Sequence, residues 1–223
     1  MRKLAAEFLG TFALVFTGTG AIITNDISGG AVTHVGIALT FGLIVLAMIH
    51  TVGDVSGAHL NPAVTLGFFA ARRLEGNSVL PYIASQCAGA VLASLTLCFL
   101  FPEHGTLGAT LPAGPVFQSF VLEVILTYIL MFVILSVSTG AKEKGITAGI
   151  AVGSVVGLQA MFAGPISGAS MNPARSLAPA LVSFHFQTLW IYLSAPVLGA
   201  LIAVFCCQCV REQGCCGLPQ AKA

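Results

Sequence analysis

The chain has 223 residues, of which 57% are hydrophobic and only 8% are charged, and its mean hydropathy is +0.96. Soluble domains carry about 25% charged residues, so the composition excludes an ordinary soluble domain and indicates an integral membrane protein. The formal net charge of +1 offers no electrostatic attraction to nucleic acid, which we therefore exclude as a partner.

Six apolar segments are long enough to cross a bilayer core, which needs about 20 residues per helix. They lie at residues 4–24, 33–53, 79–101, 116–138, 146–163 and 188–210. No convincing cleavage site follows the first segment, so we expect a retained helix rather than a signal peptide. Two further apolar pieces, Asn61–Ala70 and Asn172–Leu181, are too short to span.

The cations predict the orientation of these segments. If both termini are cytoplasmic, the external loops hold no lysine or arginine, as the positive-inside rule favours. Eight cations then lie on the cytoplasmic side: Arg2, Lys3, Arg72, Arg73, Lys142, Lys144, Arg211 and Lys222. The ninth, Arg175, sits in the second short piece. We expect a multi-pass protein of the plasma (inner) membrane with both termini in the cytoplasm.

The sequence is internally repeated. The stretch "SGAHLNPAVT" at 56–65 returns 111 residues later as "SGASMNPARS" at 167–176. Three further pairs occupy corresponding places: Glu7 and Glu123, Gly42 and Gly153, and Gly89 and Gly199. Such glycine pairs favour close contacts between helices.

Each half of the chain holds three predicted spans and one short piece. We place repeat one at about 4–101, repeat two at about 116–210, and a cytoplasmic tail at about 211–223, all within one transmembrane domain. Because three is odd, the second half must enter the membrane from the opposite side. Inverted repeats of this kind place the functional site near the middle of the membrane.

The short pieces have the signals of helices that begin at mid-membrane. Ten helical residues cover about 15 Å, half of a roughly 30 Å core. Asn61 and Asn172 suit the N-cap, and Pro62 and Pro173 suit the first turn. Non-helical backbone at this depth must be buried in protein or line a water-filled cavity. We therefore expect eight residues to turn their carbonyls toward a pore: Gly57, Ala58, His59, Leu60, Gly168, Ala169, Ser170 and Met171.

Two Asn-Pro-Ala motifs on inverted three-span repeats resemble the aquaporin (major intrinsic protein) family over nearly the whole chain. The motifs are Asn61-Pro62-Ala63 and Asn172-Pro173-Ala174, and Arg175 follows the second directly. The resemblance implies an all-α membrane protein with six transmembrane helices and two re-entrant half-helices. It also implies a homotetramer in the lipid bilayer that conducts water and small neutral solutes passively and excludes protons and ions. Such a protein is not an enzyme and needs no cofactor or metal.

The same resemblance implies a narrow outer constriction, formed here by Phe41, Ala160, Ala169 and Arg175. Strict water channels typically carry histidine where this chain has Ala160, so we expect a wider opening that also passes glycerol. Glycerol facilitators typically carry aspartate where this chain has Ser176. The stretch "AGPISGASMNPARS" resembles the nodulin-26-like branch, which leaves open a channel mainly for small neutral solutes.

Glu7 and Glu123 are acidic residues inside predicted spans. They have three interpretations: buried carboxylates that only pack, a proton relay, or acceptors for backbone N–H groups of the re-entrant loop in their own half. Their repeat-related places favour the third. An ion-coupled transporter with inverted repeats remains an alternative, but it should have ion-coordinating acids beside its broken helices, and Asp54 is the nearest.

Histidine and cysteine are the residue types in this sequence that could bind a soft metal or form a disulfide. His59 has no second ligand spaced with it, so we expect no metal site there. The cysteines near the C-terminus are predicted at or beyond the inner face, in a reducing compartment, where disulfides are disfavoured. These are Cys206, Cys207, Cys209, Cys215 and Cys216. We expect reduced thiols there. Palmitoylation in a eukaryotic host and a soft-metal site without a recognised spacing are the open alternatives.

Overall fold

The computed structural model describes residues 1–138 and 142–210, and the side chains of 142–146 are outside that description. Within these residues the structure has eight helices and no strand. The helices are α1 (Arg2–Ile27), α2 (Thr33–Ser56), α3 (Pro62–Ala70), α4 (Gly76–Leu100), α5 (Val116–Val137), α6 (Lys142–Ser167), α7 (Pro173–Ser183) and α8 (Leu189–Val210). The predicted tail 211–223, with Arg211, Cys215, Cys216 and Lys222, lies outside the described residues.

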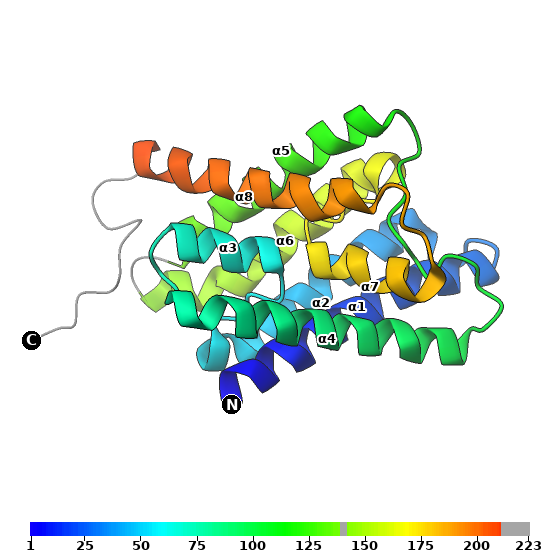
Figure 1. Ribbon diagram of the computed structural model, residues 1–223, viewed down its shortest axis with the longest axis horizontal. Coiled ribbons are helices and arrows are strands. Elements are labelled where there is room, and N and C mark those ends of the chain that lie inside the picture. Colours follow the sequence, from blue (N-terminus) through cyan, green and yellow to red (C-terminus); the bar gives the residue numbers. More distant parts are fainter. Residues whose placement is uncertain (139–141, 211–223) are drawn as a thin grey trace, which may run out of the picture.

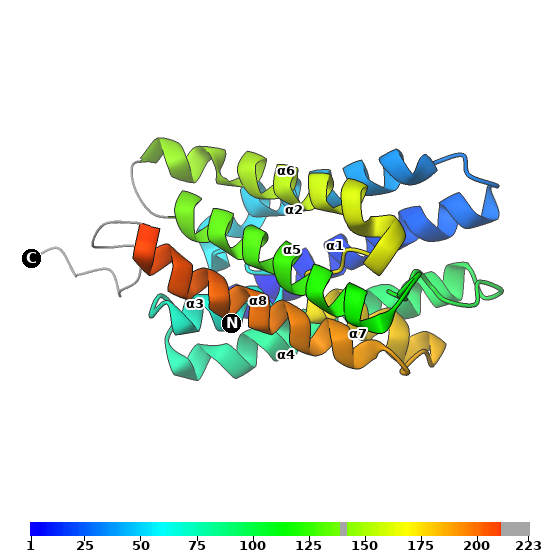
Figure 2. The ribbon, with the colours of Figure 1, turned by 90° about the horizontal axis from the view of Figure 1, so that it is seen from above.

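Six of these helices are long and apolar enough to cross a membrane, and they correspond to the six predicted spans. They run roughly along the long axis of the molecule (Figure 1 and Figure 2). Several extend beyond the predicted bounds, because the helix continues through polar residues such as Asn25 and Asp26 at its ends. A hydropathy pattern detects only the apolar part of such a helix.

The packing of the helices repeats between the two halves. α1 contacts α2 and α4, and α5 contacts α6 and α8 in the same way, while α2 and α6 join the halves. The join is close: a Cβ added at Gly42 or at Gly153 would lie 2.6 Å from the carbonyl oxygen of the other residue. The two glycines therefore let the helix backbones approach as closely as membrane helices commonly do.

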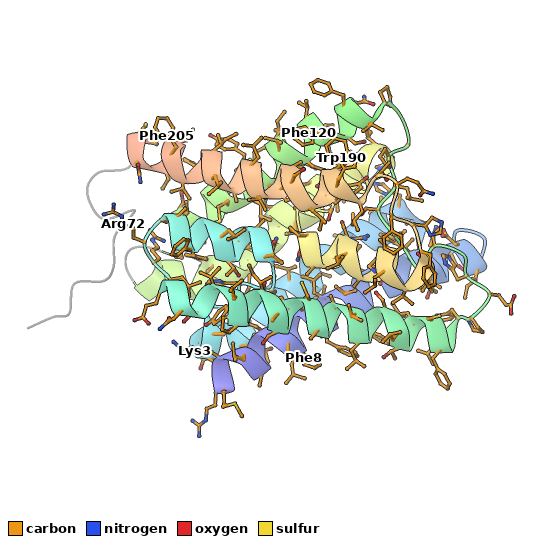
Figure 3. The ribbon with its side chains drawn as sticks, viewed as in Figure 1. Lys3, Phe8, Arg72, Phe120, Trp190 and Phe205 are labelled. Carbon is orange, nitrogen blue, oxygen red and sulfur yellow. The ribbon has the colours of Figure 1, made fainter. Side chains whose placement is uncertain are left out.

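The outer face of the bundle is apolar. Trp190 is 53% exposed and Phe205 is 68% exposed, and Figure 3 shows Phe8, Phe120, Trp190 and Phe205 on the periphery. Large apolar side chains in this exposed state need a lipid or protein environment. Lys3 and Arg72 lie toward the end of the bundle at which α8 ends, as expected if that end is the cytoplasmic side.

One expectation about the cysteines is wrong. Cys207 is disulfide-bonded, although a reduced thiol was expected at this position. The other described cysteines, Cys87, Cys98, Cys206 and Cys209, are free. The sequence pattern gives the place of a cysteine along a helix but not the distance to a second sulfur atom.

Candidate pore

α3 and α7 are half-helices whose N-termini meet inside the bundle (Figure 1). Asn61 and Asn172 are their N-caps, and both have extended backbone. The side-chain oxygen of Asn61 accepts from the backbone N–H of Ala63 at 2.9 Å. The oxygen of Asn172 accepts from Ala174 at 3.0 Å and from Arg175 at 3.3 Å. Capping explains why the chain starts a helix at Asn-Pro in the middle of an apolar region.

The two N-caps bind each other's loops. The amide nitrogen of Asn61 donates to the carbonyl of Met171 at 2.7 Å, and that of Asn172 donates to the carbonyl of Leu60 at 2.8 Å. A side-chain amide has two N–H donors. Since each cross-loop bond uses one, each asparagine keeps a second N–H for a molecule in the cavity that both line.

Both loops before the half-helices have the same unusual backbone. In the first, φ is positive at Gly57 (88°), Ala58 (46°) and Leu60 (50°). In the second, φ is positive at the equivalent residues Gly168 (82°), Ala169 (41°) and Met171 (53°). A non-glycine residue in this region costs about 1–3 kcal/mol and persists only where surrounding contacts hold it.

Glu7 supplies those contacts for the first loop. One carboxylate oxygen accepts from the Ser56 hydroxyl at 2.7 Å and from the His59 N–H at 2.9 Å. The other accepts from the Leu60 N–H at 2.7 Å and from the Gln86 amide at 2.8 Å. The side chain is fully buried, so these four bonds replace the water that the carboxylate has lost.

Glu123 holds the second loop in the same way with one bond fewer. It accepts from the Ser167 hydroxyl at 2.8 Å, from the Ser170 N–H at 2.9 Å and from the Met171 N–H at 2.8 Å. The geometry of both glutamates matches the scaffold interpretation. Neither of them lines the cavity, which argues against a proton relay through the pore.

Two tyrosines complete the symmetric scaffold. The Tyr82 hydroxyl donates to the Ser56 carbonyl at 2.9 Å, and the Tyr192 hydroxyl donates to the Ser167 carbonyl at 2.7 Å. Neither pair was predicted, although the tyrosines recur 110 positions apart and the serines 111 apart. This repeat-related spacing is the sequence signal that identifies them. Gln86 had no such signal, because Pro196 stands 110 positions after it.

One cavity of about 120 Å3 connects these parts. It extends from Ser138 and Ala148, beyond the end of α5 and near the start of α6, to Arg175. Seven of the eight predicted carbonyl residues line it. Gly168 does not, and a Cβ added there would lie 3.1 Å from the Thr110 side chain. The left-handed backbone at Gly168 packs against the segment between α4 and α5, and a pore-facing carbonyl at Gly168 stays a prediction.

The four predicted constriction residues line the cavity together. The Arg175 guanidinium donates to the carbonyl of Gly108 at 2.9 Å, and its carbon atom lies 5.1 Å from the centre of the Phe41 ring. Arg175 is only 3% exposed, so the ring and the carbonyl replace much of its hydration. Gly108 was not predicted from the sequence, because it lies in the connection between the two repeats and has no repeat partner.

Ser176 lies beside this constriction but does not line the cavity. Its hydroxyl is fully buried, accepts from the Thr110 hydroxyl at 2.8 Å and pairs with the Ser170 hydroxyl. Ser176 therefore contacts the second loop through Ser170 rather than the cavity.

His59 also lines the cavity. Its Nδ1 lies 3.2 Å from the Thr65 hydroxyl, and its ring stacks on Phe68 with 4.5 Å between ring centres. In the described part of the chain, no three histidine, cysteine or acidic side chains are grouped as a metal site would need. Asp54 is exposed and does not line the cavity, so the transporter alternative lacks its acid at the broken helices.

Residues 1–207 match the major intrinsic protein family. Aquaporin NIP1-1 of Oryza sativa subsp. japonica is 45% identical, with 95% of this chain and 75% of that protein covered. Nodulin-26 of Glycine max is 43% identical, with 95% and 78% covered. The X-ray structure of the aquaglyceroporin from Plasmodium falciparum is similar with a TM-score of 0.80 and 27% identity, covering 92% of this chain and 93% of that one. The chain therefore belongs to the major intrinsic protein family, and it is a channel of the aquaporin type rather than an enzyme.

Proposed function

We propose that this channel conducts water passively, also passes small uncharged solutes such as glycerol, and excludes protons and ions. The observation that carries the proposal is the pair of capped half-helices, whose Asn61 and Asn172 amides face one cavity. The N-terminus of each helix is equivalent to roughly +0.5 charge, so the point where two meet repels cations.

The same arrangement supports proton exclusion. A water molecule between Asn61 and Asn172 accepts a hydrogen bond from each spare amide N–H, which occupies both of its lone pairs. Its own hydrogens then point away from the junction in both directions. A proton cannot pass along the file, because no water in that orientation continues the chain of donors. Selectivity by lining groups and positive half-helix ends is the general mechanism of aquaporin-type pores.

The composition of the outer constriction supports solute conduction. Ala160 and Ala169 line one side of the opening with small apolar side chains, which leaves the opening wide. Arg175 presents N–H donors to a passing hydroxyl. The named relatives include plant aquaporins and Nodulin-26, and the similar solved structure is an aquaglyceroporin. A channel mainly for neutral solutes, with little water flow, is the second candidate that these names favour.

The test is stopped-flow light scattering on purified protein in lipid vesicles. We expect water permeability above that of empty vesicles, and glycerol uptake that neither saturates nor depends on an ion gradient. Ala160→His should reduce glycerol uptake several-fold while water flow changes less than twofold, because the ring fills the opening. Equal losses of both fluxes, or a parent protein without glycerol uptake, would contradict the proposed solute range.

We also propose the assembly and the membrane in which the channel works. The distribution of cations supports cytoplasmic termini in a plasma (inner) membrane, and family resemblance supports a homotetramer in which residues 1–223 are one channel domain. Cross-linking in native membranes tests the tetramer, and protease access from each side tests the orientation. Cross-linked species no larger than a dimer in native membranes would contradict the first proposal.

A further inference from the structure

The inverted repeat maps the outer constriction onto four other residues. Asn61 and Asn172 are 111 positions apart. The same offset connects the outer ring, which is Phe41, Ala160, Ala169 and Arg175, with four residues that we call the inner ring. The inner ring consists of Val152, Ile49, Ala58 and Val64, respectively. All four line the same cavity as the outer ring, although a shared offset alone would not require that.

The two re-entrant loops are equivalent in structure as well as in sequence. The scaffold bonds that place the two loops have nearly equal lengths in both halves, as the Asn61 and Asn172 cross-loop bonds of 2.7 and 2.8 Å show. The left-handed backbone at Ala58 (46°) recurs at Ala169 (41°). The inner ring therefore lies on the far side of the asparagine pair from the outer ring, at the corresponding depth.

The two rings differ in chemistry. The outer ring has a guanidinium and an aromatic face, whereas the inner ring is entirely aliphatic. Val64 and Val152 are 3% and 6% exposed, so both are packed in place, and branching at Cβ keeps such side chains in few rotamers. A polar solute at this depth has the loop carbonyls and the His59 ring as its polar partners, and contact with the aliphatic wall costs it hydration.

At one pair of equivalent positions the smaller side chain is in the outer ring and the larger one is in the inner ring. Ala160 leaves the outer ring open, while its inner counterpart Ile49 carries three more carbon atoms. A solute admitted by the outer ring must therefore still pass Ile49.

We propose that the inner ring is a second selectivity barrier and that Ile49 is its size-determining residue. The inference rests on the proposed channel function and deepens it. Arg175 and Ala160 select neutral solutes that accept hydrogen bonds, and the inner ring then rejects those that are wider or carry more hydroxyl groups. The solutes concerned are linear polyols larger than glycerol.

The test compares water, glycerol and the four-carbon polyol erythritol in vesicles containing Ile49→Ala. We expect erythritol uptake to rise on the order of tenfold, as for removal of bulk from an apolar selectivity pocket, while water permeability changes less than twofold. Leu43→Ala is the matched control, because Leu43 lies on the same helix, is 59% exposed and does not line the cavity. It should leave all three fluxes unchanged.

A second variant protects the test against misfolding of the first. Ile49→Phe adds bulk and should reduce glycerol uptake more than water permeability. If Ile49→Ala and Ile49→Phe both elute as the parent does in size exclusion and keep its ratio of erythritol to water, the inner ring is not a barrier. A parent protein that conducts neither water nor glycerol would instead overturn the channel function itself, so the two failures are distinguishable.

Discussion

On each side of the asparagine pair, a fully buried glutamate holds a re-entrant loop in the same twisted conformation. Glu7 does so with four hydrogen bonds and Glu123 with three. The cavity lining does not follow this symmetry. The outer half has Arg175 against Phe41, and the inner half has Val64 and Val152 in the corresponding places.

The contrast between the symmetric loops and the asymmetric cavity lining separates the residues that set the backbone from those that set the chemistry of the cavity. The duplicated residues set the path of the backbone and the junction of the half-helices. The proposed constriction consists of residues that differ between the repeats, and its Arg175 is bound by Gly108 in the connection between them. Because those residues carry little of the scaffold, we expect changes in them to alter selectivity while the fold persists.

The largest expected effect comes from removing a scaffold carboxylate. Glu7→Ala leaves buried N–H and O–H donors without an acceptor, and each unsatisfied donor costs about 1–3 kcal/mol. We expect little or no folded protein in detergent size exclusion. Glu123→Ala should be somewhat less damaging, because it strands three donors rather than four. Wild-type thermal midpoints for both variants would refute the scaffold role.

The next effect is on selectivity at Arg175. Arg175→Ala removes a charge and the bulk beside Phe41, and water in the cavity can solvate the freed Gly108 carbonyl. We expect a folded protein with several-fold higher uptake of neutral solutes and a measurable cation leak in vesicles. Val64→Ala, at the inner counterpart, should cause no cation leak. An aggregated Arg175→Ala protein would show instead that the arginine is structural.

A smaller effect distinguishes the two helix caps. Loss of an asparagine N-cap costs about 1 kcal/mol, and each substitution also removes a cross-loop bond. Asn172→Ala should lower the thermal midpoint more than Asn61→Ala, because Asn172 accepts from two backbone N–H groups and Asn61 from one. The reverse order would mean that the cap bonds do not set the stability of the half-helices.

The smallest effect concerns the connection that carries Gly108. His104 lies 3.2 Å from the Asp26 carboxylate and accepts from the Leu107 N–H at 3.0 Å. Asp26 is half exposed, and a hydrogen bond of this kind contributes about 0.5–1.5 kcal/mol. His104→Ala should lower the thermal midpoint only slightly and loosen solute selectivity less than Arg175→Ala does. Glu103→Ala, an exposed neighbour, is the control, and an equal effect there would remove the special role of His104.

The six spans, the half-helices and their caps were predictable from the sequence, because hydropathy and the Asn-Pro signal act locally. The roles of Gln86 and Gly108 were not, since each depends on a contact between distant segments and has no repeat partner. The orientation of the Gly168 backbone also depends on packing, here against Thr110. Repetition in the sequence thus predicts the shared scaffold, while the unique contacts require coordinates.

The most direct test of the account measures osmotic water flow and internal acidification in the same vesicles, under an osmotic gradient and a pH gradient together. With Asn61 and Asn172 both donating to one water at the junction, we expect water permeability well above that of empty vesicles. Acidification should stay at the empty-vesicle rate until a protonophore is added. Acidification that rises in proportion to water flow would contradict the central claim, because it requires an unbroken chain of water through the junction.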